Sequence, residues 1–221
     1  MEMNTPTTYQ VTISKEELSE LPLAVYDGNV ILVDNREDML SAIQKIKQSP
    51  VIGFDTETKP SFRRGACNKV SLLQLSSYTN CYLFRLNKIG FPAELVELLE
   101  DANITKIGLS IRDDFFNLNK IRKIRPAGFV DLQQYVKQCK IADNSLQRIY
   151  AILFGERISK SQRMTNWEAD TLTPSQMNYA AMDAISCVKI YNFINEGRFI
   201  PESSPYYKKI DILDEQIQKT E

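Results

Sequence analysis

The chain has 221 residues, of which 43% are hydrophobic and 25% are charged, and it contains no histidine. This length and composition fit one soluble globular domain with short extensions. The lack of histidine excludes Ser-His-Asp and Cys-His catalysis, histidine-containing zinc sites and an imidazole general base. With 27 basic and 28 acidic residues the net charge is -1, so binding to a polyanion would depend on local basic clusters.

Cysteine spacing and the N-terminal sequence indicate where the protein resides. The cysteines are Cys67, Cys81, Cys139 and Cys187. They form no Cys-x-x-Cys pair, and no secretory signal peptide precedes them. We therefore expect reduced thiols and a cytoplasmic location. No apolar run approaches the roughly 20 residues that cross a bilayer, so we expect no membrane partner. We also expect no nucleotide cofactor, and the sequence leaves the protein partners unknown.

Taken in chain order, the first 25 residues show little periodicity and predict an arm with one short helix near Lys15 to Glu20. The predicted strands that follow are 26–33, 51–57, 70–76, 81–86, 104–109 and 128–131. The predicted helices are 35–49, 92–100, 113–121, 132–140, 144–154 and 173–195. A hairpin after the strand at 51–57 and helical crossovers later predict a mixed sheet, with three antiparallel strands followed by parallel ones. This domain spans 26–197, between an arm (1–25) and a peripheral tail (198–221).

Two carboxylates lie at the end of the strand at 51–57. Because side chains alternate between the faces of a strand, Asp55 and Glu57 point the same way, about 7 Å apart. Carboxylates this close repel each other unless a divalent cation lies between them. The pair therefore indicates hydrolytic chemistry that depends on carboxylates, hydroxyl groups and metal.

A well-specified helix carries a second pair of polar side chains. Thr-Pro-Ser-Gln at 173–176 predicts a helix start with a capping box. Tyr179 and Asp183 follow four residues apart and so share one helical face. Tyr207 and Asp211 have the same spacing, but they lie in the charged tail without a capping signal. We therefore interpret Tyr179 and Asp183 as the functional pair.

A third acidic element lies between these two. Asp113 and Asp114 follow the strand at 104–109, at a strand-to-helix junction where open sheets commonly bind ligands. Aspartate also favours the first turn of a helix for purely structural reasons. We expect one of the two to cap the helix and the other to serve the site.

In this order, the residues Asp55-x-Glu57, Asp114 and Tyr179-x-x-x-Asp183 resemble the DEDDy branch of the 3′-5′ exonucleases. The segments 53–57, 70–75, 106–108 and 166–167 are similar to the exonuclease domain of the Werner syndrome helicase and its stand-alone bacterial relatives; ribonuclease D is a more distant likeness. The resemblance implies an α/β, ribonuclease-H-like fold for residues 26–197, in which helices flank a mixed sheet of five to six strands.

The resemblance also implies an activity, namely hydrolysis of phosphodiester bonds from the 3′ end of DNA or RNA with release of nucleoside 5′-monophosphates. Two divalent cations, Mg2+ or Mn2+, would be the cofactors. Asp55 would bridge both ions, Glu57 and Asp183 would complete the nucleophile-side site, and Asp114 would support the other ion. Tyr179 would position the attacking water. By alignment Asp114, rather than Asp113, takes the third motif's position.

Other polar residues are candidates for contacts with the substrate. They are Thr56, Thr58, Arg63, Arg64, Lys160 and Arg163. The alternative for the basic residues is a solvated face, and for the threonines an ordinary place in a strand. Trp167 is expected to be a packing anchor rather than a base-stacking residue. Two other functions stay open: a catalytically inactive nucleic-acid-binding module and a ribonuclease-H-like endonuclease.

Overall fold

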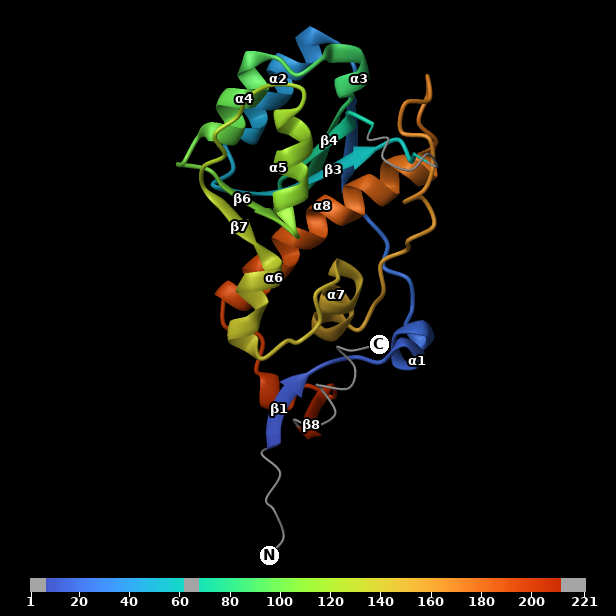
Figure 1. Ribbon diagram of the computed structural model, residues 1–221, viewed down its shortest axis with the longest axis vertical. Helices are drawn as coiled ribbons and strands as arrows, with labels where there is room; N and C mark the ends of the chain where they lie inside the picture. Colours follow the sequence, from blue (N-terminus) through green and yellow to red (C-terminus); the bar gives the residue numbers. More distant parts are fainter. Residues whose placement is uncertain (1–6, 62–67, 212–221) are drawn as a thin grey trace, which may run out of the picture.

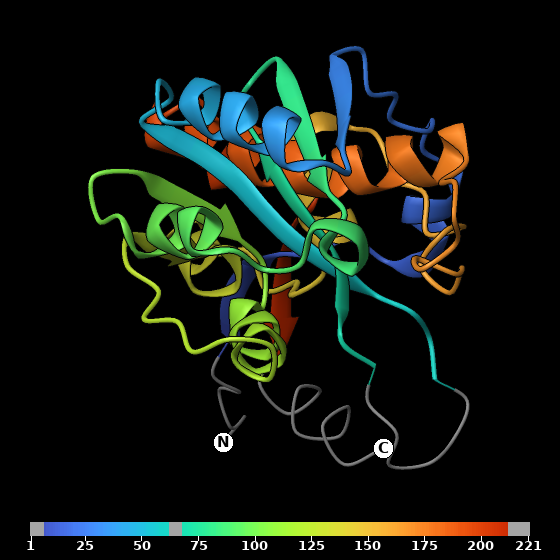
Figure 2. The same ribbon diagram turned by 90° about the horizontal axis from the view of Figure 1, so that it is seen from above.

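The computed structural model describes residues 7–61 and 68–211, and within them a mixed sheet is covered by helices on both faces (Figures 1 and 2). The strands of this sheet are β2 (Asn29–Val33), β3 (Val51–Thr58), β4 (Val70–Ser76), β5 (Asn80–Phe84), β6 (Thr105–Gly108) and β7 (Phe129–Asp131). The helices are α1 (Lys15–Glu20), α2 (Arg36–Ile46), α3 (Leu86–Ile89), α4 (Ala93–Glu100), α5 (Ile111–Asn119), α6 (Leu132–Tyr135), α7 (Leu146–Phe154) and α8 (Pro174–Asn195). Short 3-10 turns lie at Val136–Cys139 and Pro201–Ser203.

The strand order is β2-β5-β4-β3-β6-β7. The chain makes β3, β4 and β5 antiparallel, whereas β6 and β7 continue the sheet parallel to β3. Helical crossovers produce the parallel pairs, because parallel neighbours need a long connection. The predicted mixed α/β sheet is therefore confirmed. Its sixth strand is β2, which pairs in parallel with β5 at one edge.

The two faces of the sheet bury different sets of helices. Phe54, Leu73 and Leu75 face a core formed with α2, α4 and α5. The opposite face, which carries Leu72 and Leu83, packs on α8. Since neighbours along a strand alternate, Asp55 and Glu57 belong to the face covered by α8. The sheet thus delivers both carboxylates beneath one long helix.

Small residues let α8 approach β3 closely. Ala180, Ala181 and Ala184 are fully buried. A Cβ atom added at Gly53 would lie 1.9 Å from the carbonyl oxygen of Ala184. Such contact leaves no space for a side chain at position 53, so the glycine sets the separation between the helix and the strand that bears Asp55.

The two ends of the described chain pair with each other in a separate two-stranded antiparallel sheet. Its strands are β1 (Thr7–Val11) and β8 (Tyr207–Asp211). The rings of Tyr9 and Tyr207 stack with their centroids 5.2 Å apart. The sequence predicted neither strand, and this pairing is how the arm and the tail meet (Figure 1).

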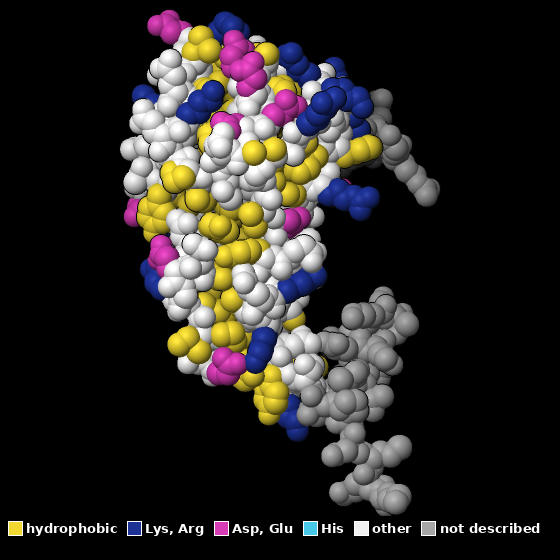
Figure 3. Space-filling view, turned by 90° about the vertical axis from the view of Figure 1, so that its left-hand side faces the viewer, with side chains coloured by type: hydrophobic (Ala, Val, Ile, Leu, Met, Phe, Trp, Pro, Cys, Tyr) yellow, Lys and Arg dark blue, Asp and Glu magenta, His cyan; other side chains and the backbone are white. Residues whose placement is uncertain are grey.

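Surface charge is mixed on the face shown in Figure 3, where basic and acidic side chains lie near one another and apolar side chains occupy the middle. No one-sign field covers that face. Cys81, Cys139 and Cys187 are buried and free, while Cys67 lies outside the described residues. Within residues 7–61 and 68–211, no helix combines the length and apolar character that a membrane crossing requires.

Replacing Gly53 by alanine tests the close packing of α8. The added methyl group meets backbone atoms, which cannot move aside cheaply, so we expect Gly53→Ala to lower the free energy of unfolding by about 3 kcal/mol. Gly155→Ala is the matched control, because nothing lies within 4 Å of its added Cβ; its left-handed backbone, with φ 68° and ψ 19°, should cost about 1 kcal/mol. Urea unfolding measures both. Equal losses in the two variants would contradict the packing argument.

Candidate active site

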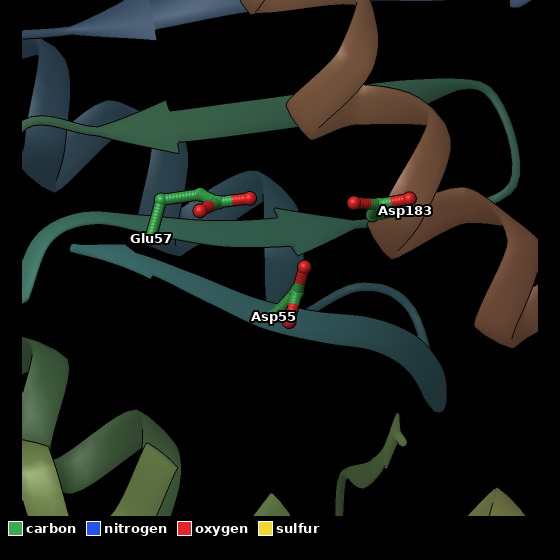
Figure 4. A group of neighbouring side chains, drawn as sticks. All are labelled: Asp55, Glu57 and Asp183. Atoms are coloured by element: carbon green, nitrogen blue, oxygen red, sulfur yellow. The ribbon is translucent and has the colours of Figure 1, made fainter. Parts of the chain in front are cut away.

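Three carboxylates converge where β3 passes under α8 (Figure 4). One carboxylate oxygen from each of Asp55, Glu57 and Asp183 lies within 4.8 Å of the others. The alternation of β3 supplies the first two, as the sequence predicted. The register between β3 and β4 shifts between Glu57 and Thr58, and an irregularity of this kind commonly redirects side chains next to a site.

The start of α8 is fixed by the predicted capping box. The Thr173 hydroxyl accepts from the backbone N–H of Gln176 at 3.2 Å, and the Gln176 side chain accepts from the backbone N–H of Thr173 at 3.0 Å. The Gln176 amide also donates to the Thr165 hydroxyl at 3.0 Å. From this fixed start, Tyr179 and Asp183 follow on one face, where the phenol hydrogen-bonds to the carboxylate.

Asp114 reaches the cluster from the opposite face of the sheet. It lies in the first turn of α5, and the Thr56 hydroxyl donates a hydrogen bond to its carboxylate. Asp113 is exposed, whereas Asp114 is half-buried and acts electrostatically on Asp55 and Glu57. Of the two adjacent aspartates, therefore, Asp114 faces the cluster, although it lies outside the group of three.

Asp55, Glu57, Tyr179 and Asp183 line a cleft of about 360 Å3, whereas Asp114 is not among its lining residues. Thr56, Lys160 and Arg163 also line it, so it contains both charge signs. Thr58 is not among its lining residues. Arg63 and Arg64 lie outside the described residues.

Burial dominates the electrostatics of the two carboxylates on β3. It raises the pKa of Asp55 well above its ordinary value, and the charges of Asp183, Asp114 and Glu57 add to the rise. Burial, followed by Asp183 and Asp114, raises the pKa of Glu57 to about 8, while Arg163 acts in the opposite direction. Both carboxylates therefore hold a proton more tightly than a free carboxyl group does.

The other two acids behave similarly. Burial raises the pKa of Asp183 to about 7, although its hydrogen bond from Tyr179 and the charge of Lys160 favour the ionised form. Burial also raises the pKa of Asp114 to about 7 against the effect of the Thr56 hydrogen bond. Burial and the Asp183 charge raise the pKa of Tyr179 above its usual range, so this phenol stays protonated.

The donor set fits divalent cations. Mg2+ and Mn2+ prefer carboxylate oxygen ligands, and the three clustered carboxylates supply them within one site. Among the described residues, none of these three carboxylates takes part in a salt bridge. A bound cation would offset both their repulsion and their burial.

Two buried side chains that sequence reasoning did not assign to the site support it from behind. Trp167 is fully buried, with its ring centroid 6.0 Å from that of Tyr179, so it packs as predicted. Arg85, also fully buried, donates to the backbone carbonyls of Ala169 and Asp170 and so ties the loop after Trp167 to the sheet. Arg85 follows β5 without a recognisable motif, and only its burial reveals this contact.

Comparison with known proteins now identifies the family. Residues 30–197 match the family model described as 3′-5′ exonuclease. The chain therefore belongs to the 3′-5′ exonuclease family, whose members are nucleases of the hydrolase class. This agrees with the resemblance that the sequence motifs indicated.

Individual relatives agree with this assignment. The chain is 29% identical to the bifunctional 3′-5′ exonuclease/ATP-dependent helicase WRN of Mus musculus over 84% of its length, and 36% identical to exonuclease 3′-5′ domain-containing protein 2 of Drosophila melanogaster over 64%. It spans 14% and 24% of those two proteins. The fold is similar to the Aedes aegypti Nibbler EXO domain, with a TM-score of 0.71, 20% identity and coverage of 82% of this chain and 95% of that one.

The raised carboxylate pKa values predict an inverted pH dependence of stability without metal. Unfolded carboxylates titrate near pH 4, whereas Asp114 and Asp183 titrate at about 7 and Glu57 at about 8 in the folded state. The folded state therefore binds more protons across this interval, and its stability falls as pH rises through it. The midpoint of thermal unfolding in EDTA should therefore decrease as the pH is raised from 5 to 8.

Adding Mn2+ should raise the midpoint most at the upper end of this range, because the ligands must lose their protons to bind metal. Asp183→Asn, which removes one titrating group, should show a shallower decrease in EDTA. A midpoint that is independent of pH in EDTA would contradict this assignment.

Proposed function

We propose that the chain is a metal-dependent 3′-5′ exonuclease that hydrolyses phosphodiester bonds from the 3′ end of a nucleic acid and releases nucleoside 5′-monophosphates. The observation that carries this proposal is the group of Asp55, Glu57 and Asp183, each of which offers one carboxylate oxygen within 4.8 Å of the other two, at the wall of an open cleft. Family membership supports the reaction class.

Each acid has a role in holding two cations, Mg2+ or Mn2+. Asp55 would contact both ions, with Glu57 and Asp183 completing one site and Asp114 supporting the other. When bound, such ions acidify a water molecule and stabilise the charge that develops on the phosphoryl group. The position of Asp114 on α5, held by Thr56, suits support from the opposite face of the sheet.

Tyr179 orients the attacking water and does not act as the base that deprotonates it. Its raised pKa keeps the proton on the phenol, and that proton is donated to Asp183. The phenol oxygen remains free to accept a hydrogen bond from the attacking water and so to direct a water lone pair toward phosphorus. Trp167 packs against the ring and restricts its rotation.

Two basic residues in the cleft are suited to bind the phosphate groups of the substrate. Lys160 and Arg163 are exposed, line the same cleft and act electrostatically on Asp183. Contacts of this kind position a nucleic-acid backbone without reading its sequence. DNA and RNA both present such a backbone, and both are candidate substrates.

Substitution of the acids and the tyrosine tests the reaction. Loss of a charged ligand removes several kcal/mol of transition-state stabilisation, so Asp55→Asn and Asp183→Asn should each lower kcat by about 10²- to 10³-fold. Tyr179→Phe should lower kcat by about 10²-fold with little change in KM. Release of nucleotides from a labelled oligonucleotide with Mg2+ or Mn2+ measures the rates.

Tyr207→Phe is the matched control, because Tyr207 has the same spacing to an aspartate but lies on β8. It should retain wild-type activity. Full activity of Asp55→Asn would reject the assignment, and internal fragments in place of mononucleotides would favour the endonuclease alternative. A wild-type protein that binds nucleic acid without degrading it would favour the inactive binding module.

The salt dependence of oligonucleotide binding tests the proposed phosphate contacts of Lys160 and Arg163. Removal of one phosphate contact should make the slope of log K against log salt shallower by about 0.7 for a single strand. We expect this change for Lys160→Ala and for Arg163→Ala, measured by fluorescence anisotropy with a labelled oligonucleotide in Ca2+. Lys209→Ala, an exposed lysine on β8, is the control. Unchanged slopes for the first two variants would remove them from the interface.

A further inference from the structure

A glutamine without a hydrogen-bond partner lies beside the carboxylate cluster. Gln74 is in the middle of β4 and is fully buried. Neither its side-chain nitrogen nor its side-chain oxygen has a hydrogen-bond partner within the described part of the chain. A buried amide without a partner costs folding free energy, and such groups are rare in native proteins. A residue retained at this cost invites a functional explanation.

The strand register places this amide next to Asp55. Gln74 lies directly opposite Asp55 in the antiparallel pair of β3 and β4, and directly opposed residues point to the same face with Cβ atoms about 5 Å apart. On its other side Gln74 pairs with Leu83 of β5. Leu83 packs against α8, as does Leu72 two residues before Gln74. The Gln74 side chain is therefore enclosed between the sheet and α8, at the level of Asp55.

The surroundings give the amide few other uses. Leu72, Leu83 and the alanines of α8 belong to the neighbouring apolar cluster and offer no side-chain donor or acceptor. The same cluster contains Trp167, whose indole N–H is a donor and lacks a partner among the described residues, but it offers no charged acceptor for the Gln74 N–H. Asp55, in contrast, offers carboxylate oxygens, which accept a hydrogen bond from the backbone N–H of Thr56. An ionised carboxylate accepts about four hydrogen bonds, so Asp55 has capacity for a further donor.

We propose that Gln74 is a positioning residue for Asp55: its side-chain N–H donates to the Asp55 carboxylate and fixes the direction in which the carboxylate oxygens face the cations. The inference rests on the proposed function, since it concerns Asp55 as a metal ligand. Hydrogen bonds to metal ligands set their orientation, and their loss typically weakens metal binding about 10- to 100-fold. Gln74 makes this contact in the metal-bound site.

A purely structural role predicts a different outcome. If Gln74 only filled space, an apolar side chain of similar length would serve better, because it carries no amide to desolvate. The positioning role instead predicts that such a replacement leaves the metal-free fold intact, or makes it more stable, while metal binding weakens. Stability and metal affinity then change in opposite directions, which a packing defect does not produce.

The test uses Gln74→Met, which keeps the unbranched shape and removes the donor. Thermal unfolding in EDTA should give a midpoint equal to or above that of the wild type. Calorimetric titration should show Mn2+ affinity lower by about 10- to 100-fold. In the exonuclease assay, kcat should fall at low Mn2+ and recover as Mn2+ is raised, with KM for the oligonucleotide unchanged. Gln74→Leu replaces this variant if the methionine variant does not fold.

Leu83→Met is the matched control, since it introduces the same side chain on the next strand and the same face. It should bind Mn2+ like the wild type. Wild-type Mn2+ affinity in Gln74→Met, or an equal loss of affinity in Leu83→Met, would overturn the inference and leave the proposed function standing. Absence of Mn2+ binding by the wild-type protein would overturn both.

Discussion

The contact of α8 with β3 at Gly53 is the constraint on which the rest of the site depends. Asp55 and Glu57 belong to the strand and Asp183 belongs to the helix, so the separation of these two elements determines the separation of the carboxylates. The contact between Gly53 and Ala184 holds that separation near its minimum. Alanines along the helix and the capping box at its start maintain the same alignment over several turns. Backbone packing thus holds three carboxylates close enough to repel one another, and a bound cation would offset this repulsion.

The repulsion between the carboxylates also affects which groups can hold protons in this protein, which has no histidine. Burial and mutual repulsion raise the pKa values of the acids, so protons and cations compete for the same oxygens. Burial and the Asp183 charge raise the pKa of Tyr179 in the same place, which is why we assign it an orienting role in the proposed mechanism. Lys160 and Arg163 add positive charge on the cleft wall, beside the acids. Under the proposed function, the cations and the phosphate would bind at neighbouring parts of one cleft.

Local signals made much of this predictable from sequence. Alternation along a strand placed Asp55 and Glu57 together, and the capping box at Thr173 located α8 with its two polar residues. Contacts between distant segments were not predictable. The hydrogen bond between Thr56 and Asp114 joins residues 58 positions apart. The sequence marks 70–76 as a strand but does not show that Gln74 lies opposite Asp55. The pairing of β1 with β8 was missed because β8 shows no apolar alternation, and because each strand depends on a partner at the opposite end of the described chain.

The position of Trp167 has an optical consequence. It is the sole tryptophan among the 221 residues, it is shielded from water, and its ring lies 6.0 Å from that of Tyr179. Indole emission from the native protein therefore arises from one place, directly behind the phenol that bonds to Asp183. Because indole emission responds to nearby charge and polarity, filling the acidic site changes the field that this one fluorophore experiences. The unmodified protein thus contains its own spectroscopic reporter for the state of the cleft.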